Sequence, residues 1–492
     1  MLGIWHSHAE YQRYVSDELS RMAQVSPFTV LEYEAEISKL YILNLDHMKP
    51  IIAPLYSPVG RSANLQPEIF RSLVLCNMLG FPLDKWVFEK LPKNPVLQIA
   101  CGFSGKLPGV ASYYDFIRRL INLHEEPRHK PKKRKPRKKL GKNKKLPPKH
   151  PNTTRRIADK ILAGRRFSRR PERVLQEIFA VVAVKSSMNL GLIPQRISLS
   201  GDGTCIRTGA SHFGVKTCEC KDWGCGCPRR FSDPNATWGW DSHNEIYFYG
   251  YTGYFISTYN KAEKLDLPLY LRLVEASRHD SVSALVALAE FRDLYPELTI
   301  ENFISDSASD NYPTYELLHQ WDIGAVIALN SKNKGNFKYP QALSVDEHGV
   351  PTCPGGNKMS YHGFCGKDRC RLKYRCPKAV GKPYKKCVSC SPSAYGRTIY
   401  TKPDWDLRLF TRVPRGSDHW KSIFKQRTAA ERVNNRILHH YGLENSHVRG
   451  KGRISFFATV AAINVHLDAQ LAKMISNGAF RFADILTSAK AA

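Results

Sequence analysis

The stretch "QRISLSGDG", residues 195–203, introduces the pattern on which the predicted fold rests. Apolar and polar residues alternate, as in a strand with one buried face, and the run ends at Asp202 and Gly203. A second stretch, "LTIENFISD" (298–306), ends in the same way at Asp306. Each of these two acids therefore follows a predicted strand.

Strand and helix patterns alternate around these two stretches. The chain order is strand, strand, strand, helix, strand, helix, strand, which is typical of an α/β sheet covered by helices. The other predicted strands are "EIYFYGYTGYFIST" (245–258), "LPLYLRLVEA" (267–276) and "IGAVIAL" (323–329), and the helices are "DSVSALVALAEFRDLY" (280–295) and "YPTYELLHQW" (312–321).

The length of 492 residues predicts about two to four domains. Composition and periodicity change along the chain and divide it. The predicted parts are a helical N-terminal domain for DNA binding or dimerisation (1–125), a basic flexible linker (126–172), the first part of the α/β core (173–330, with a Cys-rich loop at 211–235), a Cys-rich, partly β insertion (331–415), C-terminal helices that return to the core (416–475) and a tail (476–492).

The charge balance indicates a polyanionic partner. There are 74 Lys and Arg against 44 Asp and Glu, a formal net charge of +30, so nucleic acid is the expected ligand. Residues 127–150 alone hold 13 Lys and Arg, five Pro and no acid. This composition predicts a disordered segment that contacts phosphates, through residues such as Lys132, Lys133, Arg134 and Lys135, although a solvated tether is the alternative.

The sequence predicts a cytoplasmic protein with no membrane contact. The N-terminus lacks the basic start and apolar core of a signal peptide. The most apolar stretch (454–467) is too short for a spanning helix and contains Asn464 and His466. Thirteen Cys without an export signal indicate a reducing compartment, where clustered cysteines bind metal more often than they form disulfides.

Asp202 and Asp306 are candidate metal ligands, with Glu431 as a third. Ligands of open α/β sheets gather at the carboxyl ends of the strands. Three carboxylates from separate elements suit Mg²⁺ or Mn²⁺, and two such ions about 4 Å apart can cleave a phosphodiester. Each Asp taken alone is equally explained as a turn or cap residue.

The helical stretch "FKQRTAAERVNNRILHH" (424–440) holds Glu431 as its single acid among Arg, Lys, Asn and His. Its apolar stripe, which includes Val433 and Ile437, predicts packing on the sheet, with Glu431 and Arg427 on the opposite, mainly polar side. The alternative is a plain salt bridge from Arg427 to Glu431, in the weaker of the two orientations.

With these residues in place, the chain resembles the DDE transposases of bacterial insertion sequences. The resemblance rests on "GDGTCIRTGA", "EASRHDSVSAL", "SDSASDNYPTYELL" and, most specifically, "RGSDHWKSIFKQRTAAERVNNRI" followed by "VRGKGRISFFATVAAINV". A weaker echo is "LPGVASYYDFIRRL" in the N-terminal part. The resemblance covers residues 60–125 and 196–470 and leaves the basic linker outside.

The resemblance implies an RNase H-like mixed sheet flanked by helices, with an insertion before the final Glu. It implies that Asp202, Asp306 and Glu431 bind Mg²⁺ and catalyse cleavage of double-stranded DNA at terminal inverted repeats, followed by strand transfer into target DNA. A homodimer on nucleoid DNA is expected. The expected DNA contacts are Arg427, Arg432, Arg436, Arg449 and Lys451.

The chain departs from the family's helix motif of Tyr, Arg, Glu and Lys. Phe424 replaces the Tyr, and Leu438 stands where the family has Lys. Asp310, four residues after Asp306, is a competing candidate, but we expect it to cap the helix that starts near Tyr312.

Two groups of cysteines predict structural zinc, with free thiols or disulfides as alternatives. Four thiolates can enclose Zn²⁺ in a tetrahedron. The first group is Cys218, Cys220, Cys225 and Cys227, and the preferred set in the second is Cys353, Cys376, Cys387 and Cys390, chosen from six candidates that include Cys365 and Cys370. Cys76, Cys101 and Cys205 are predicted as isolated core residues.

Three further residues have open roles. Asp280, preceded by His279, could approach the metal site, but a helix cap is the favoured interpretation. Trp405 and Trp420 are expected to pack in a core, although either could stack on a base.

Two alternatives to a transposase keep the same residues. One is a non-catalytic zinc and DNA-binding protein derived from such an ancestor, and the other is a stand-alone metal-dependent nuclease.

Overall fold

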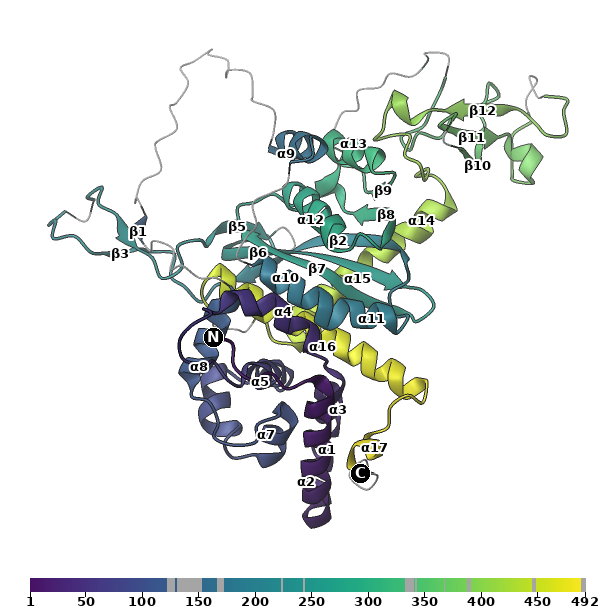
Figure 1. The fold of residues 1–492 in the computed structure, drawn as a ribbon. Coiled ribbons are helices and arrows are strands. Elements are labelled where there is room, and N and C mark those ends of the chain that lie inside the picture. The colour runs from purple at the N-terminus through teal and green to yellow at the C-terminus, as the bar shows by residue number, and fades with distance from the viewer. Residues whose placement is uncertain are drawn as a thin grey trace.

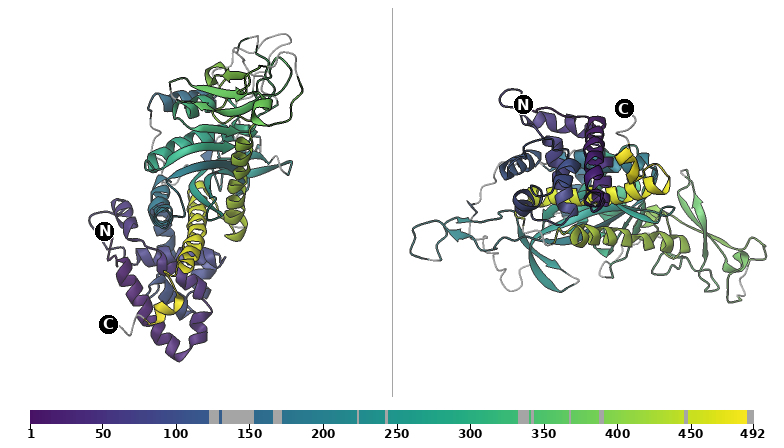
Figure 2. Two further views of the ribbon diagram at one scale, coloured as in Figure 1. Left: turned by 90° about the vertical axis from the view of Figure 1, so that its right-hand side faces the viewer. Right: turned by 90° about the horizontal axis from the view of Figure 1, so that it is seen from below.

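The computed structural model describes residues 1–121, 129–130, 153–165, 172–222, 224–241, 244–331, 340, 343–366, 368–386, 391–444 and 448–487. Helices from the start of the chain form one end of the molecule, a mixed sheet with its helices forms the middle, and a small β region projects from the other end (Figures 1 and 2). The fold is mixed α/β, as the sequence predicted.

The N-terminal end is helical throughout its described length. Local signals account for its boundaries: Ser7 and Glu10 form a capping box at the start of α1, and Asn94 caps α7, which ends at the left-handed Gly102. The elements are α1 (His8–Val25), α2 (Pro27–Leu31), α3 (Glu34–Ile42), η1 (Asp46–Met48), α4 (Lys49–Ile52), η2 (Ala53–Leu55), α5 (Gln66–Met78), α6 (Leu83–Lys85), η3 (Trp86–Lys90), α7 (Pro95–Cys101) and α8 (Val110–Leu120).

The central sheet has the order β5-β6-β2-β8-β9, and β7 also pairs with β6. The pairs β2–β6 and β6–β7 are antiparallel, whereas β2–β8 and β8–β9 are parallel. The strand β2 therefore lies in the interior of the sheet. The strands are β2 (Arg196–Arg207), β5 (Thr237–Asp241), β6 (Ile246–Asn260), β7 (Leu265–Glu275), β8 (Thr299–Ser305) and β9 (Gly324–Ile327).

Helices cover the sheet, and some of them connect its strands. The helix α12 follows β7, α13 follows β8, and the last core helices come after the insertion. They are α10 (Arg173–Phe179), η4 (Ala180–Val184), α11 (Lys185–Asn189), α12 (Asp280–Leu294), η5 (Ser307–Ser309), α13 (Tyr312–Gln320), α14 (Asp418–Phe424), η8 (Lys425–Arg427), α15 (Thr428–Asn435) and η9 (Arg436–His440).

The long helix α16 (Lys451–Ser476) joins the sheet to the N-terminal helices. On one side, the Asn464 amide donates to the Val74 carbonyl of α5 at 3.2 Å. On the other side, the ring nitrogens of His466 lie 2.8 Å from Ser187 Oγ and 2.7 Å from the Pro268 carbonyl. These helices therefore share one hydrophobic core with the sheet. By length and composition α16 is the single membrane-span candidate in the described part of the chain, but 89% of its most apolar window is buried inside the protein.

Two described segments differ from the predicted linker and tail. Within 126–172, α9 (Thr153–Leu162) packs on α12 and α13, with Ala158 buried against Leu285 and Leu317. Within 476–492, α17 (Phe482–Thr487) packs on α1, and Ser20 Oγ donates to the Leu486 carbonyl at 2.8 Å. Both helices form because they bury apolar side chains against elements distant in sequence.

The insertion between β9 and α14 has a small core of its own. Its antiparallel sheet consists of β10 (Ser360–Cys365), β11 (Arg371–Arg375) and β12 (Thr398–Thr401), accompanied by η6 (Pro377–Val380) and η7 (Pro403–Trp405). The residues buried in it include Leu372, Tyr374 and Phe410. Figure 1 shows this region projecting from the edge of the molecule beyond β9.

Candidate functional site

The strand β2 carries Asp202 on the face that α15 covers. Asn434 of α15 donates from Nδ2 to Asp202 Oδ2 at 3.3 Å. Two residues earlier on the same face, Ser200 Oγ donates to the Arg427 carbonyl at 3.0 Å. These two contacts, one at each end of α15, fix the helix over the middle of β2. The sequence predicted that this strand ends at Asp202, but it continues to Arg207 through its pairing with β6.

Asp306 reaches the same region from the neighbouring strand. The strands β2 and β8 run parallel, and Ser200 pairs with Ile304. Asp202 and Asp306 each come two residues after this pair, so they lie side by side. The Asp306 carboxylate accepts a hydrogen bond from Ala308 N at 3.0 Å and so caps η5. It is both a cap residue and a neighbour of Asp202.

Glu431 is the most exposed of the three predicted ligands. Its side chain is 46% exposed, and its Oε1 lies 2.6 Å from Arg427 Nη1. Arg427, a predicted phosphate contact, forms the i,i+4 salt bridge to Glu431 that the sequence left as the alternative. Ala429, Ala430 and Val433 are fully buried, in line with the predicted apolar stripe.

Burial, followed by neighbouring negative charge, raises the pKa of two of the acids, Asp202 and Asp280. Burial, together with the charges of Asp306, Asp280 and Glu431, raises the pKa of Asp202 to about 7, and Arg427 only partly offsets this. Burial and the charge of Asp306 likewise raise the pKa of Asp280 to about 6. A divalent cation would relieve this repulsion, because it stabilises the ionised form of every carboxylate that binds it.

A pH dependence of stability follows from the raised pKa of Asp202. The folded state keeps a proton on Asp202 up to about pH 7, whereas the unfolded chain loses it near the usual Asp value of 3.8. Between those values the folded state binds more protons, so the stability contributed by this group falls as pH rises. In buffer free of divalent cations, Asp202→Asn should therefore have a higher melting temperature than the wild type at pH 8.

The difference between the two proteins should narrow toward pH 4, where Asp202 is neutral in the wild type as well. Addition of Mg²⁺ at pH 8 should raise the melting temperature of the wild type more than that of Asp202→Asn. Equal melting temperatures at pH 8 without cations would refute the electrostatic description of this cluster.

Several predicted DNA contacts are engaged in ion pairs within the chain. Arg432 pairs with Asp266 through two nitrogens, at 2.5 and 2.8 Å. Arg436 lies 3.0 Å from Asp468, and Lys451 lies 3.5 Å from Glu172. Arg449 is exposed, and the predicted contacts Lys132, Lys133, Arg134 and Lys135 lie outside the described residues.

Asp310 has a structural role, but not the predicted one. The cap of α13 is Asn311, whose side chain accepts from Thr314 N. Asp310 is fully buried and receives three hydrogen bonds from Arg408, at 2.8–3.0 Å. Asp310 therefore anchors the insertion to the core, and Asp306 is the acid that faces Asp202.

Two residues of the site were missed or under-weighted. Asn434 was placed on a polar surface, but it is 6% exposed and contacts Asp202. The favoured role of Asp280 was a cap, but the cap of α12 is His279, which accepts from Ser281 N, and Asp280 is the first helical residue. The sequence signal that could have identified Asp280 is its position: it is a carboxylate next to a helix cap, shortly after the predicted strand 267–276.

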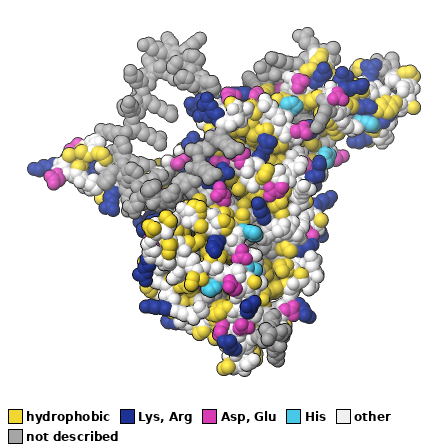
Figure 3. Space-filling model, in the orientation of Figure 1, with side chains coloured by type: hydrophobic (Ala, Val, Ile, Leu, Met, Phe, Trp, Pro, Cys, Tyr) yellow, Lys and Arg dark blue, Asp and Glu magenta, His cyan; other side chains and the backbone are white. Residues whose placement is uncertain are grey.

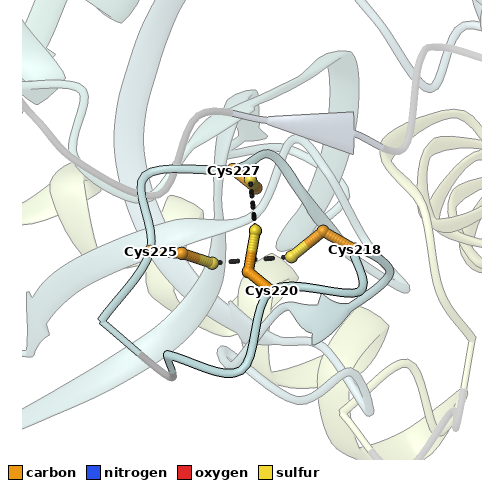
Figure 4. A group of neighbouring side chains, drawn as sticks. All are labelled: Cys218, Cys220, Cys225 and Cys227. Atoms are coloured by element: carbon orange, nitrogen blue, oxygen red, sulfur yellow. Dashed lines mark hydrogen bonds between the residues drawn. The ribbon is translucent and has the colours of Figure 1, made fainter.

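The four cysteines of the first group converge on one point (Figure 4). They lie in the loop between β3 (Val215–Lys216) and β4 (Arg229–Arg230), and β4 also pairs with β1 (His129–Lys130). Cys218 and Cys225 are 3.5 Å apart at sulfur, Cys220 and Cys227 are 3.6 Å apart, and all four sulfurs lie within 4.8 Å of one another.

This group fits a tetrahedral thiolate site for zinc. Sulfurs bound to Zn²⁺ at about 2.3 Å would lie about 3.8 Å apart, close to the spacing found here. The spacing is too long for a disulfide, in which the sulfurs are about 2.05 Å apart. Arg229 Nη2 approaches Cys225 Sγ at 3.7 Å, so a basic side chain borders the group.

We expect the purified protein to contain at least one zinc per chain. The double substitution Cys218→Ser/Cys225→Ser should remove one zinc, because two of the four thiolates are lost. The matched control is Cys205→Ser, since Cys205 is a half-buried cysteine of β2 outside the group. Metal analysis by mass spectrometry measures this, and an unchanged zinc content in the double variant would remove the assignment.

The second group of cysteines is only partly described. Cys353 and Cys376 are buried, whereas Cys387 and Cys390 lie outside the described residues. Cys76 and Cys101 are buried as predicted, but Cys205 is half-buried.

Trp405 and Trp420 pack against other aromatic side chains, as the favoured prediction stated. Trp420 stacks on Phe424, and Trp405 contacts Phe410 edge-on.

Basic side chains are spread over the visible face of the molecule and extend onto the projecting insertion (Figure 3). Residues 343–415 contain 15 Lys and Arg against five Asp and Glu. The acids discussed above therefore belong to a chain that is strongly positive elsewhere.

The sequence matches no protein-family model, and no curated protein is significantly similar to it.

Proposed function

We propose that this chain is a DNA transposase that cleaves phosphodiesters at the ends of its element and transfers the freed strands into target DNA. The observation that carries the proposal is that Asp306, directly after β8, and Glu431, on α15, lie close enough to Asp202 of β2 to act electrostatically on it, with burial the larger cause of its raised pKa. Such a cluster suits Mg²⁺ or Mn²⁺, which are bound by carboxylate oxygens and by substrate phosphates.

The sheet supports an RNase H-like assignment. When the core strands are counted without the Cys-rich hairpin and β5, β2 is the first and β8 the fourth. Their parallel pairing puts Asp202, which lies within β2, beside Asp306, which directly follows β8. The final Glu lies on a helix after an insertion, which is the arrangement that the sequence resemblance implies.

The residues at this site would have different roles: metal ligand, orientation of a ligand, and charge balance. Asp202, Asp306 and Glu431 would hold the cations, and bound cations supply an activated nucleophile and stabilise the leaving oxygen. Asn434 orients the Asp202 carboxylate through the bond at 3.3 Å. Arg427 balances the charge of Glu431 while the site is empty of substrate and is long enough to turn to a phosphate when DNA arrives.

The net charge of +30 supports double-stranded DNA as the substrate and nucleoid DNA in the cytoplasm as its location. Two DNA ends must be brought together for strand transfer, so we include a homodimer in the proposal. The zinc group, the basic segment and the insertion would hold DNA rather than react with it.

The proposal is tested by incubating the protein with DNA that carries the sequences flanking its own coding region. Cleavage at those ends with Mg²⁺, and none without a divalent cation, is the expected result. Binding without cleavage would favour the non-catalytic DNA-binding protein, and cleavage without selectivity for the flanks would favour a nuclease.

A further inference from the structure

Asp280 lies against β2 on the face opposite to Asp202. Neighbouring residues of a strand point to opposite faces, so Asp202 meets α15 and the next residue, Gly203, meets α12. A Cβ placed on Gly203 would lie 2.6 Å from Asp280 Oδ1 and 2.7 Å from its Oδ2. Glycine at this position therefore lets the Asp280 carboxylate press against the strand.

The Asp280 carboxylate has no hydrogen-bond or ion-pair partner among the described residues, although it is half-buried. Its neighbour His279 is occupied by the cap bond to Ser281 N at 3.2 Å. Asp306 caps η5, and η5 contacts α12, the helix that begins at Asp280. The pairing of β2 with β8 also brings Asp306 beside Asp202.

Two buried polar atoms without a hydrogen-bond partner among the described residues border this cluster, one on each face. Asn434 is 6% exposed and donates from Nδ2 to Asp202, whereas its Oδ1 is the first of these two atoms. Tyr254, 1% exposed, pairs with Gly203 across β6 and β2, and its hydroxyl lacks a partner in the described part of the chain. Buried polar atoms are rarely left unsatisfied, so both indicate a polar ligand at this position.

We propose that Asp280 is a fourth cation ligand, which together with Asp306 binds a divalent cation on the Gly203 side of β2. Asp202 and Glu431 would bind a cation on the other side, and Asp306 would be shared. The class of ligand is a hard divalent cation, Mg²⁺ or Mn²⁺, because the available atoms are carboxylate and amide oxygens. This inference rests on the proposed function and adds a ligand that the three-acid site does not contain.

The test is Mn²⁺ binding to the full-length protein. Isothermal titration calorimetry and electron paramagnetic resonance measure the number of bound ions and their affinity. Wild type should bind two Mn²⁺ per chain, and Asp280→Asn should lose one or bind it at least tenfold more weakly. Asp280→Glu should restore part of the affinity. The matched control is Asp293→Asn, which removes an exposed carboxylate from the same helix and should bind as the wild type does.

A second variant keeps the test decisive if Asp280→Asn folds poorly. Gly203→Ala introduces a methyl group where the Asp280 oxygens lie, and it should weaken the same cation while Asp202 stays in place. Circular dichroism and zinc content report whether each variant is folded.

The outcomes separate this inference from the proposed function. If wild type binds two Mn²⁺ and Asp280→Asn binds both with unchanged affinity, Asp280 is not a ligand and the three-acid centre stands. If wild type binds one Mn²⁺, which Asp202→Asn loses and Asp280→Asn keeps, Asp280 and Asp306 share a proton instead, and the inference is overturned. If wild type binds no Mn²⁺, the proposed function fails together with it.

Discussion

Replacement of Glu431 by Gln should lower the rate of DNA cleavage by about 1,000-fold or more, equivalent to about 4 kcal/mol of transition-state stabilisation. The amide has nearly the same size but carries no charge, so it cannot take the place of a carboxylate ligand to Mg²⁺. Because the Glu431 side chain is 46% exposed and pairs with Arg427 alone in the described structure, its loss should cost the fold only a few tenths of a kcal/mol.

The matched control is Glu444→Gln. Glu444 is similarly exposed, at 42%, and within the described residues it forms one ion pair, with His439 at 3.1 Å. Both variants should bind DNA as the wild type does, as measured by fluorescence anisotropy, and only Glu431→Gln should lose cleavage in a gel assay with Mg²⁺. Equal cleavage by Glu431→Gln and wild type would remove Glu431 from the site.

Replacement of Arg408 by Ala should destabilise the junction between the core and the insertion by about 3–5 kcal/mol. Arg408 is 6% exposed and Asp310 is fully buried, so the variant removes the charge of Arg408 from beside a buried carboxylate. Two other bonds to Asp310, from Tyr315 at 2.8 Å and from Asn330 N at 2.7 Å, come from uncharged groups. Urea denaturation, with hydrogen exchange measured on β10–β12, reports the loss.

The control for Arg408 is Arg412→Ala in the same segment. Arg412 pairs with Asp322 at the surface, with side chains 39% and 64% exposed, so its removal should cost less than about 1 kcal/mol. If the two variants unfold at the same urea concentration, the buried pair does not anchor the insertion.

The sequence identified the strand ending before Asp306 because that ending is a local signal, and parallel pairing of β2 with β8 brings Asp306 beside Asp202. It misjudged the end of the first strand, because β2 continues past Asp202 to Arg207 by pairing with the distant strand β6. The convergence of the four cysteines was likewise visible in their spacing, because eight to ten residues of one loop cannot carry them far apart.

Other parts of the site depend on contacts between distant segments, which no local pattern reveals. Asp280 has the sequence context of a cap, and its role depends on Gly203, 77 positions earlier, having no side chain. Arg432 was expected to face DNA but pairs with Asp266, 166 positions away. The sequence on both sides of α9 is strongly basic, as in a linker. The feature that sets α9 apart is its packing on α12 and α13, which the sequence does not reveal.

The central claim is that the carboxylate cluster performs cation-dependent strand transfer. The most direct measurement uses a short duplex from the flank of the coding region, already ending in a free 3′-hydroxyl, mixed with plasmid DNA, the protein and Mg²⁺. We expect the duplex to be joined covalently to the plasmid by the wild type and not by Asp202→Asn. Joining by Asp202→Asn, or no joining by a wild-type protein that binds the duplex and Mg²⁺, would contradict the claim.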